Sequence, residues 1–207
     1  MSKIAAVILA AGRSERMGAY KALLPFGEQT VIEACVAYLL DGGVESIVVV
    51  AGDWTDDVRS QLRELPVAFA ENPPAGSEMG ASIIRGVEKL PHDADAVFIV
   101  LVDQPAIPPQ VIRFMINERE RTGASLLVPA HKGRRGHPVL IDLRYREQLL
   151  TLDPKRGLRA FFEPRGDEIL VVPIDSPYIA RDMDTWDDYT ALYRELFHSD
   201  PPTVSHS

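Results

Sequence analysis

Short apolar runs alternate with segments of helical periodicity along most of this chain, and this alternation constrains its fold more than any other feature. The first run, Ile4–Leu9, is apolar at every position and rich in β-branched and small residues, as expected of a strand buried on both faces of a parallel sheet. Strands are predicted at Ile4–Leu9, 46–50, 67–70, Ala96–Leu101, 125–130, 136–141 and 169–174. Helices are predicted at 31–41, 56–65, 80–90, 108–122, 144–152, 156–163 and 185–197. The pattern predicts a single α/β domain of three layers around a mostly parallel central sheet.

Composition limits the partners and the setting of this domain. The 207 residues, 46% of them hydrophobic, suffice for one domain with a sizeable core, predicted at 1–199, and the proline-containing tail 200–207 is predicted to be disordered. A net charge of −8 argues against nonspecific nucleic-acid binding, and every apolar run is too short to cross a membrane. Lys3 and the apolar residues after it could imitate a secretory signal, but they run directly into Arg13 and Arg16, so we expect a cytoplasmic protein. Cys35 is the single cysteine and is predicted to be a packed thiol on the buried side of a helix.

A loop of small and charged residues, L-A-A-G-R-S-E-R-M-G at 9–18, follows the first predicted strand and precedes Lys21. The small residues at 10–12 would let the backbone approach a ligand closely, while Arg13, Arg16 and Lys21 add positive charge. The loop has neither the P-loop pattern nor G-x-G-x-x-G. The segment favours a polyphosphate ligand, and a surface turn with solvated charges is the alternative.

Carboxylates occur at two further places, the end of a predicted strand and the start of the last predicted helix. Asp103 directly follows the apolar run 96–102 and is held in a turn by Pro105, while four carboxylates lie at 182–188, at the start of the last predicted helix. Ligands in open α/β sheets bind beyond the carboxyl ends of the strands, so these groups are candidates for chemistry. Each also has a structural explanation, because Asp103 could cap a turn and the 182–188 group could cap a helix.

Two polar segments complete the set of candidate sites. Residues 72–82 form a polar loop after the third predicted strand and lead into a helix N-terminus. Basic residues gather at 131–137 and could converge with the first loop on a small anionic ligand. An N-capped helix and a solvated turn, respectively, are the structural alternatives.

The run L-A-A-G-x-S-x-R-M-G, followed by K-A-L-L-P at 21–25, resembles the signature of the MobA-like nucleotidyltransferase superfamily, with further landmarks in order across 4–197. The resemblance implies a Rossmann-like nucleotidyltransferase fold and Mg²⁺-dependent transfer from a nucleoside triphosphate. It implies that Arg16, Lys21 and Asp103 are catalytic. It also implies that Asp103 and Asp184 hold Mg²⁺, with Asp182 as the reserve for the second position. The implied nucleotide-binding residues are Leu9, Ala10, Ala11, Gly12, Arg13, Lys21, Asn72, Gly76, Met79, Gly80 and Ser82. Trp186 departs from the pattern D-x-D-T-P-E-D, since it replaces the usual proline.

The segment G-H-P-V-L at 136–140 resembles the molybdopterin cytidylyltransferase branch of that superfamily. The resemblance implies acceptor-side roles for Gly136, His137, Pro138 and Arg159. The A-A-G of the first loop, in place of the L-A-G-G usual in guanylyltransferase relatives, favours CTP. The implied reaction moves CMP from CTP to the phosphate of molybdopterin and releases pyrophosphate. An apo-molybdoenzyme or its chaperone is then an expected partner.

Two other functions stay open at this level. A sugar- or alditol-phosphate nucleotidyltransferase would use the same loop and carboxylates with a different acceptor pocket. A noncatalytic accessory protein that delivers cofactor to a molybdoenzyme would bind nucleotide or pterin. Such a binder would not need two metal carboxylates, so the presence of Lys21, Asp103 and Asp184 favours an enzyme.

Overall fold

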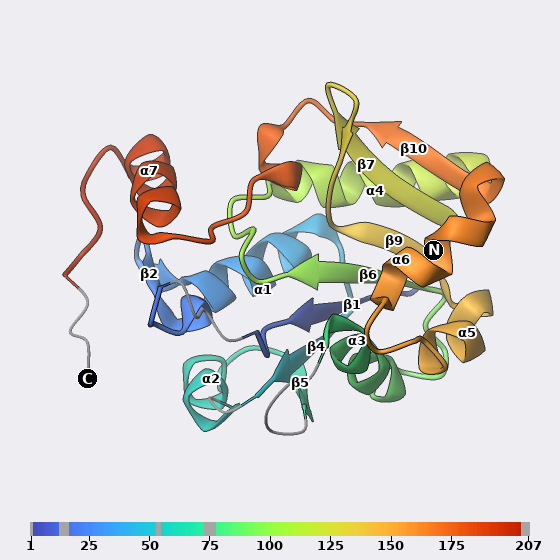
Figure 1. Cartoon of the computed structure of the whole chain (residues 1–207), viewed down its shortest axis with the longest axis horizontal. Coiled ribbons are helices and arrows are strands. Elements are labelled where there is room, and N and C mark those ends of the chain that lie inside the picture. Colours follow the sequence, from blue (N-terminus) through green and yellow to red (C-terminus); the bar gives the residue numbers. More distant parts are fainter. Residues whose placement is uncertain (1, 13–16, 53–54, 73–77, 204–207) are drawn as a thin grey trace.

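A mostly parallel sheet forms the centre of the computed structural model, which describes residues 2–12, 17–52, 55–72 and 78–203 (Figure 1). Within these residues the sheet has eight strands in the order β10-β7-β9-β6-β1-β4-β5, with β8 paired to β7. The strands are β1 (Ile4–Leu9), β2 (Pro25–Phe26), β3 (Gln29–Thr30), β4 (Ser46–Ala51), β5 (Val67–Glu71), β6 (Ala96–Leu101), β7 (Leu126–His131), β8 (Arg134–Arg135), β9 (Val139–Asp142) and β10 (Ile169–Pro173). The helices are α1 (Val31–Gly42), α2 (Thr55–Gln61), α3 (Met79–Glu88), α4 (Pro109–Thr122), α5 (Arg146–Leu150), α6 (Gly157–Phe162) and α7 (Trp186–Phe197), with 3-10 turns η1 (Lys21–Leu23), η2 (Leu143–Tyr145), η3 (Glu163–Glu168) and η4 (Pro177–Ala180).

Strand direction confirms the predicted α/β sheet and places its functional edge. In this sheet, β1 pairs in parallel with β4 and β6, β4 with β5, and β7 with β10, whereas β9 runs antiparallel to both β6 and β7. The carboxyl ends of β1 and β6 therefore lie side by side, with Leu9 in register with Leu101. The loops that follow these two strands begin at the same edge.

The sheet is covered on both faces, as the apolar runs predict. Alternate residues of β1 serve two separate cores, with Ile8 in the core that α1 and α4 cover and Val7 in the core that α3, α5 and α6 cover. Cys35 of α1 is fully buried in the first core, and burial raises the pKa of its thiol. The thiol therefore stays protonated, and the predicted packed cysteine is confirmed.

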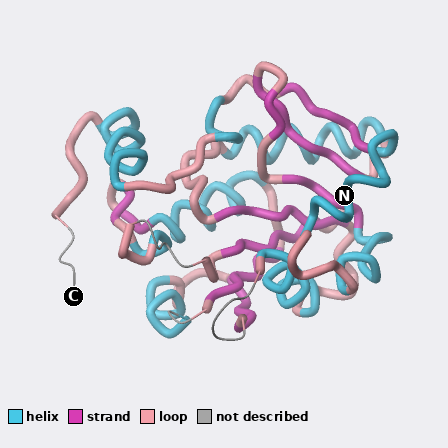
Figure 2. Tube along the Cα trace, in the orientation of Figure 1, coloured by secondary structure: helices cyan, strands magenta, loops and turns pink. Residues whose placement is uncertain are grey.

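The last helix, α7, packs beyond the sheet rather than on it. Its Tyr189 packs with Met17 and Phe26 in a third apolar cluster. Figures 1 and 2 show α7 beside β2, on the side of the molecule toward which β1 and β6 point. A capping box between Thr185 and Asp188 fixes the start of this helix, so the segment just before it has a defined position.

Element bounds differ from the predicted ones where local chemistry overrides periodicity. Helix α2 ends at Gln61 rather than at 65, because Pro66 disfavours helical geometry in the residue before it. After the helix the chain forms a turn, in which Leu65 N donates a hydrogen bond to Leu62 O at 2.9 Å. The predicted helix 144–152 opens as the 3-10 turn η2, since the Asp142 side chain accepts from Arg144 N. The short strands β2, β3 and β8 were not predicted, because two residues carry no periodicity.

The described residues contain no helix that is both long and apolar enough to span a membrane. In the tail, Asp200 pairs with Arg194 at 2.6 Å. Disorder across 200–207 stays a prediction.

The close approach of α3 to the sheet gives a stability prediction. A Cβ added at Gly86 would lie 2.2 Å from Val7 Cγ1. Gly86→Ala is therefore expected to lower the free energy of unfolding by about 1–2 kcal/mol, the overpacking cost less the gain in helix propensity. Urea denaturation would measure it, with Gly166→Ala as the control, because a Cβ there meets nothing within 4 Å. Equal losses in both variants would contradict the packing explanation.

Candidate active site

The chain leaves β1 into the predicted ligand loop through residues that differ in exposure. Ala10 is buried, donates its N–H to Val50 O at 2.9 Å and accepts a hydrogen bond from the Tyr20 hydroxyl at its own carbonyl. Gly12 is exposed, and an added Cβ would touch nothing within 4 Å. No packing inside the described protein requires a glycine there, so the open space is available to a ligand.

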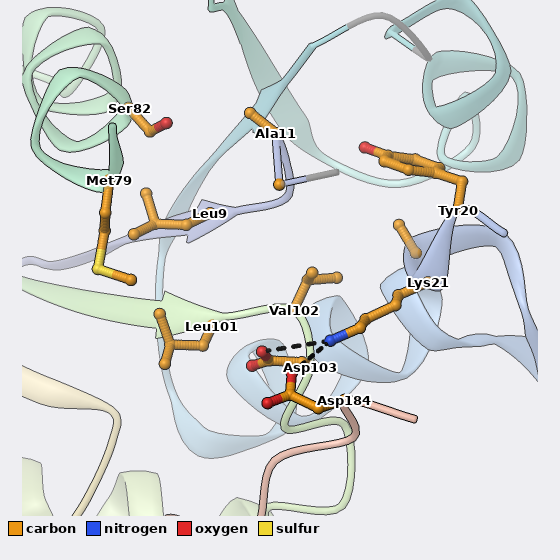
Figure 3. A pocket seen from close by; sticks show the side chains of 12 residues that line it. Leu9, Ala11, Tyr20, Lys21, Met79, Ser82, Leu101, Val102, Asp103 and Asp184 are labelled. Carbon is orange, nitrogen blue, oxygen red and sulfur yellow. Dashed lines mark hydrogen bonds and ion pairs between the residues drawn. The ribbon is translucent and has the colours of Figure 1, made fainter. Parts of the chain in front are cut away.

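Lys21 lies between two carboxylates that come from distant parts of the sequence (Figure 3). Its Nζ is 2.7 Å from Asp184 Oδ1 and 3.8 Å from Asp103 Oδ2. The lysine side chain is only 12% exposed. An ammonium held this way offsets the repulsion between two carboxylates gathered at the edge of a sheet.

Backbone contacts fix both carboxylates. Asp103 follows β6, and its carbonyl accepts a hydrogen bond from Met183 N at 2.9 Å. Asp184 comes next in the chain and reaches Lys21. Asp182 instead accepts a hydrogen bond from Gln104 Nε2 at 2.7 Å and is exposed. The structure thus brings Asp103 and Asp184 to one cation and gives Asp182 another partner.

Asp103 has an unusual electrostatic environment. Its pKa is raised to about 6: burial is the largest cause, the Asp182 and Asp184 charges act in the same direction, and Lys21 opposes them. Its Oδ1 is buried and accepts no hydrogen bond from any described residue. A buried carboxylate oxygen without a donor is costly unless a cation completes it, so the donor set suits a hard divalent ion. The described residues hold no group of three or more His, Cys, Asp or Glu side chains around one point. Mg²⁺ needs few protein ligands because water and phosphate oxygens fill its other positions.

A cavity of about 300 Å³ brings together eight of the predicted site residues. Its lining consists of Leu9, Ala11, Gly12, Tyr20, Lys21, Ala22, Met79, Ser82, Leu101, Val102, Asp103 and Asp184. In Figure 3, Met79 and Leu101 lie on one side of the cavity and Tyr20 on the other. An apolar wall beside a charged floor suits a ligand with a flat base and a polyphosphate.

Residues at the start of α3 divide between the cavity and the packing around it. Met79 is 52% exposed and lines the cavity. Ser82 is buried and lines the same cavity. Asn72 is buried and donates to Ser82 Oγ at 2.8 Å, so it supports that wall from behind. Gly80 donates its N–H to Pro154 O, and an added Cβ would lie 2.7 Å from that oxygen. The glycine therefore has a packing reason, while its contact with nucleotide stays a prediction.

Three of the four predicted acceptor-side residues line a second cavity of about 270 Å³, and Pro138 is not among its lining residues. Gly136, His137 and Arg159 line it together with Arg135 and apolar residues of β7, β9 and α6. The first two also hold the fold, since a Cβ on Gly136 would lie 1.9 Å from Ile179 O and His137 N donates to that oxygen at 2.7 Å. Burial lowers the pKa of His137, which makes its imidazole neutral at physiological pH. Pro138 follows it across a cis peptide bond.

Some predicted residues lie outside the described part of the chain, and some site residues were not predicted. Arg13, Arg16 and Gly76 fall outside the described residues, so their roles stay predictions. Tyr20 and Leu101 were missed. The position of Leu101 at the end of an apolar strand was a usable signal, whereas no spacing rule points to Tyr20.

Comparisons with known proteins agree on one family. The model of the MobA-like NTP transferase domain matches residues 6–169. The molybdenum cofactor cytidylyltransferase of Escherichia coli is 26% identical over 190 residues, covering 91% of this chain and 95% of that protein. A probable molybdenum cofactor guanylyltransferase of Bacillus mycoides is 31% identical over 162 residues, covering 76% and 78%. Nicotine blue oxidoreductase of Paenarthrobacter nicotinovorans is 28% identical over 200 residues, covering 93% and 96%.

Solved structures show the same architecture. A nucleotidyl transferase from Methanothermobacter thermautotroptrophicus superposes with a TM-score of 0.81 at 26% identity, covering 95% of this chain and 98% of that one. A Mycobacterium tuberculosis protein solved in complex with manganese superposes with a TM-score of 0.80 at 22% identity, covering 94% and 100%. The predicted Rossmann-like nucleotidyltransferase fold is confirmed.

The raised pKa of Asp103 predicts that the ionised carboxylate lowers the stability of the folded chain. Because the folded-state pKa of about 6 exceeds the unfolded value, the folded chain binds more protons between the two values. Stability therefore falls as pH rises through that window, and the loss persists above it. Asp103→Asn is expected to raise the free energy of unfolding by about 3 kcal/mol well above pH ~6, at about 1.4 kcal/mol per pKa unit, and by much less below pH ~4.

Urea denaturation at both pH values would measure this difference, with the exposed Asp175→Asn as the control, because Asp175 is not among the charges that shift the pKa of Asp103. If Asp103→Asn is no more stable than wild type above the folded-state pKa, burial of the charge carries no cost.

Proposed function

This chain belongs to the MobA-like NTP transferase domain family and is a nucleotidyltransferase, and we propose that it transfers CMP from CTP to the phosphate of molybdopterin. One observation carries the proposal: Lys21 stands between Asp103 and Asp184 at the edge where β1 and β6 end. Paired carboxylates beside a cation suit a metal-bound polyphosphate.

The reaction needs no covalent intermediate on the enzyme. A terminal phosphate oxygen of the acceptor attacks the α-phosphorus of the nucleoside triphosphate, and the bond from that phosphorus to the pyrophosphate oxygen breaks. A phosphate monoester is already a nucleophile near neutral pH. Positioning and charge stabilisation therefore supply the catalysis.

Asp103 and Asp184 would hold a divalent ion, proposed to be Mg²⁺, which when bound neutralises phosphate charge and orients the reactants. The buried, donor-free Oδ1 of Asp103 supports this assignment. Manganese in the Mycobacterium tuberculosis relative is compatible with a divalent ion. Lys21 would then exchange its carboxylate partners for triphosphate oxygens. Arg13 and Arg16 are proposed to add charge from outside the described residues.

The choice of CTP rests on the first loop and on the relatives. The A-A-G of residues 10–12 favours CTP by the resemblance described above. The relatives carry names for both cytidylyl and guanylyl transfer, so the base preference is a part of the proposal that needs its own test.

The second cavity supports an acceptor larger than a sugar phosphate. Val139 of that cavity pairs with Ile99, two residues before Leu101 of the first cavity. These two lining residues, Leu101 and Val139, therefore lie on neighbouring strands and are offset by about 7 Å along the strand direction at ~3.3 Å per residue. An acceptor with its phosphate near Lys21 would place a flat ring system over the apolar floor, near Arg135 and Arg159. A phosphorylated pterin fits that description, and an apo-molybdoenzyme or its chaperone stays a predicted partner.

A second candidate function is oxidoreduction, favoured by the likeness to nicotine blue oxidoreductase across 93% of this chain. Reduction of a substrate would require a hydride donor, and its oxidation would require a hydride acceptor. The carboxylates that flank Lys21 do not serve that chemistry, which is why nucleotidyl transfer is preferred. A reduced nicotinamide cofactor belongs among the test substrates.

Pyrophosphate release is the first test of the proposal. We expect release with CTP and Mg²⁺ only when molybdopterin is present, and much less with the other three nucleoside triphosphates. Release with a panel of sugar phosphates would move the function to the sugar-phosphate alternative. Oxidation of the nicotinamide cofactor would favour the second candidate, and no turnover with any pair would favour an accessory protein.

Matched amide variants test the second metal position. Asp184→Asn is expected to lower Mg²⁺-dependent turnover on the order of 100-fold, because it removes one of the two proposed ligands. Asp182→Asn keeps the oxygen that Gln104 contacts and is expected to change turnover by less than about threefold. Steady-state rates against Mg²⁺ concentration would separate them. The opposite ranking would reassign the ligand to Asp182.

A further inference from the structure

The segment 183–186 touches the candidate active site at three separate points. Met183 N donates to Asp103 O at 2.9 Å, and Asp184 Oδ1 accepts from Lys21 Nζ at 2.7 Å. Trp186 donates its indole Nε1–H to Met17 O at 2.8 Å. We call residues 183–186 the strap. It joins both carboxylates, the lysine and the chain just before the lysine.

The indole of Trp186 is held rigidly. Trp186 is the first residue of α7, directly after the Thr185 cap. Its ring meets Tyr189 edge to face, with centroids 5.8 Å apart at 71°. Two rings that are packed on one capped turn leave little freedom for the N–H direction. The hydrogen bond from Trp186 therefore fixes the position of Met17 relative to α7.

The same short stretch is tied at its other end. The Tyr20 hydroxyl donates to Ala10 O, so the residue before Lys21 is fixed to the end of β1. Met17 is buried in the cluster that α7 forms with β2. Residues 17–21 are thus held at Met17 by Trp186 and at Tyr20 by Ala10. Trp186 lies two residues after Asp184, so the same segment holds Met17 and presents Asp184 to Lys21.

We propose that Trp186 is a positioning residue that sets Lys21 in register with Asp184 for binding of the metal-bound nucleoside triphosphate; this inference rests on the proposed nucleotidyl transfer. The triphosphate would meet Lys21 already aligned. Without the indole donor, the ligand itself would have to order the stretch 17–21. The free-energy cost of ordering residues 17–21 then lowers the affinity for the triphosphate. The bound complex, once ordered, reacts at a similar rate.

Trp186→Phe removes the N–H donor and keeps an aromatic ring. We expect the Kd for CTP with Mg²⁺, measured by calorimetry, and the KM for CTP to rise about fivefold, the effect of one lost neutral hydrogen bond. The kcat should stay within about twofold. Tyr178→Phe is the matched control. It removes the 2.8 Å hydrogen bond that the Tyr178 hydroxyl of η4 donates to Glu195 of α7, the helix that Trp186 begins. It should leave Kd and KM unchanged.

Fluorescence supplies a second measurement on a folded chain that retains Trp186. The sequence has two tryptophans, so Trp54→Phe leaves Trp186 as the sole emitter. Its emission should change on titration with CTP and Mg²⁺, with the same midpoint as calorimetry. The change should be absent when Lys21→Ala is added.

The outcomes separate the two proposals. No binding of any of the four nucleoside triphosphates to the wild-type chain would overturn the proposed function and the role of Trp186 together. Binding to wild type with equal affinity in Trp186→Phe would overturn the role of Trp186 alone. A loss of kcat at unchanged Kd, an equal rise of Kd in Tyr178→Phe, or silent emission during saturation would overturn it as well.

Discussion

The contact between the Lys21 ammonium and two carboxylates is the interaction on which the site depends. Asp103 follows β6 and Asp184 precedes α7, so nothing local holds them together. Burial opposes the ionised form of Asp103, as its raised pKa records, and the Asp184 charge adds to that opposition. Lys21 is the described group that offsets both effects, with Nζ within 4 Å of each carboxylate. The folded chain thus accepts an unfavourable charge arrangement whose natural completion is a polyvalent cation and an anionic ligand.

Topology explains why these groups meet. In a parallel sheet, the loops after neighbouring strands emerge at one edge, and the pairing of β1 with β6 delivers Gly12 and Asp103 to the same place. The third component comes from outside the sheet. Helix α7 packs beyond that edge through an apolar cluster of its own, and its capped start presents Asp184. The edge that carries the candidate site is therefore also the seam between the sheet and α7, so the stability of α7 docking and the geometry of the site are coupled.

Local sequence predicted the elements and the main charged residues because their signals are short-range. Apolar runs predicted the sheet, and Asp103 was predicted at the end of its strand. Distances between segments carry no such signal. The hydrogen bond between Gln104 and Asp182 joins residues 78 positions apart, and the contact of Trp186 with Met17 spans 169 positions. Likewise, the packing roles of Gly80 and Gly136 depend on carbonyls that approach from distant turns.

The two cavities divide the problem of specificity. The first contains the residues proposed to bind the metal and the triphosphate, and among described residues it shares no lining side chain with the second. The second is bounded by Gly136 and His137, whose backbones are locked against η4, and by the long side chains of Arg135 and Arg159. A rigid apolar floor with cations at its rim selects by shape first and by charge second. Under the proposed function, acceptor identity would change through the rim and floor of the second cavity, while Lys21, Asp103 and Asp184 would keep the chemistry constant.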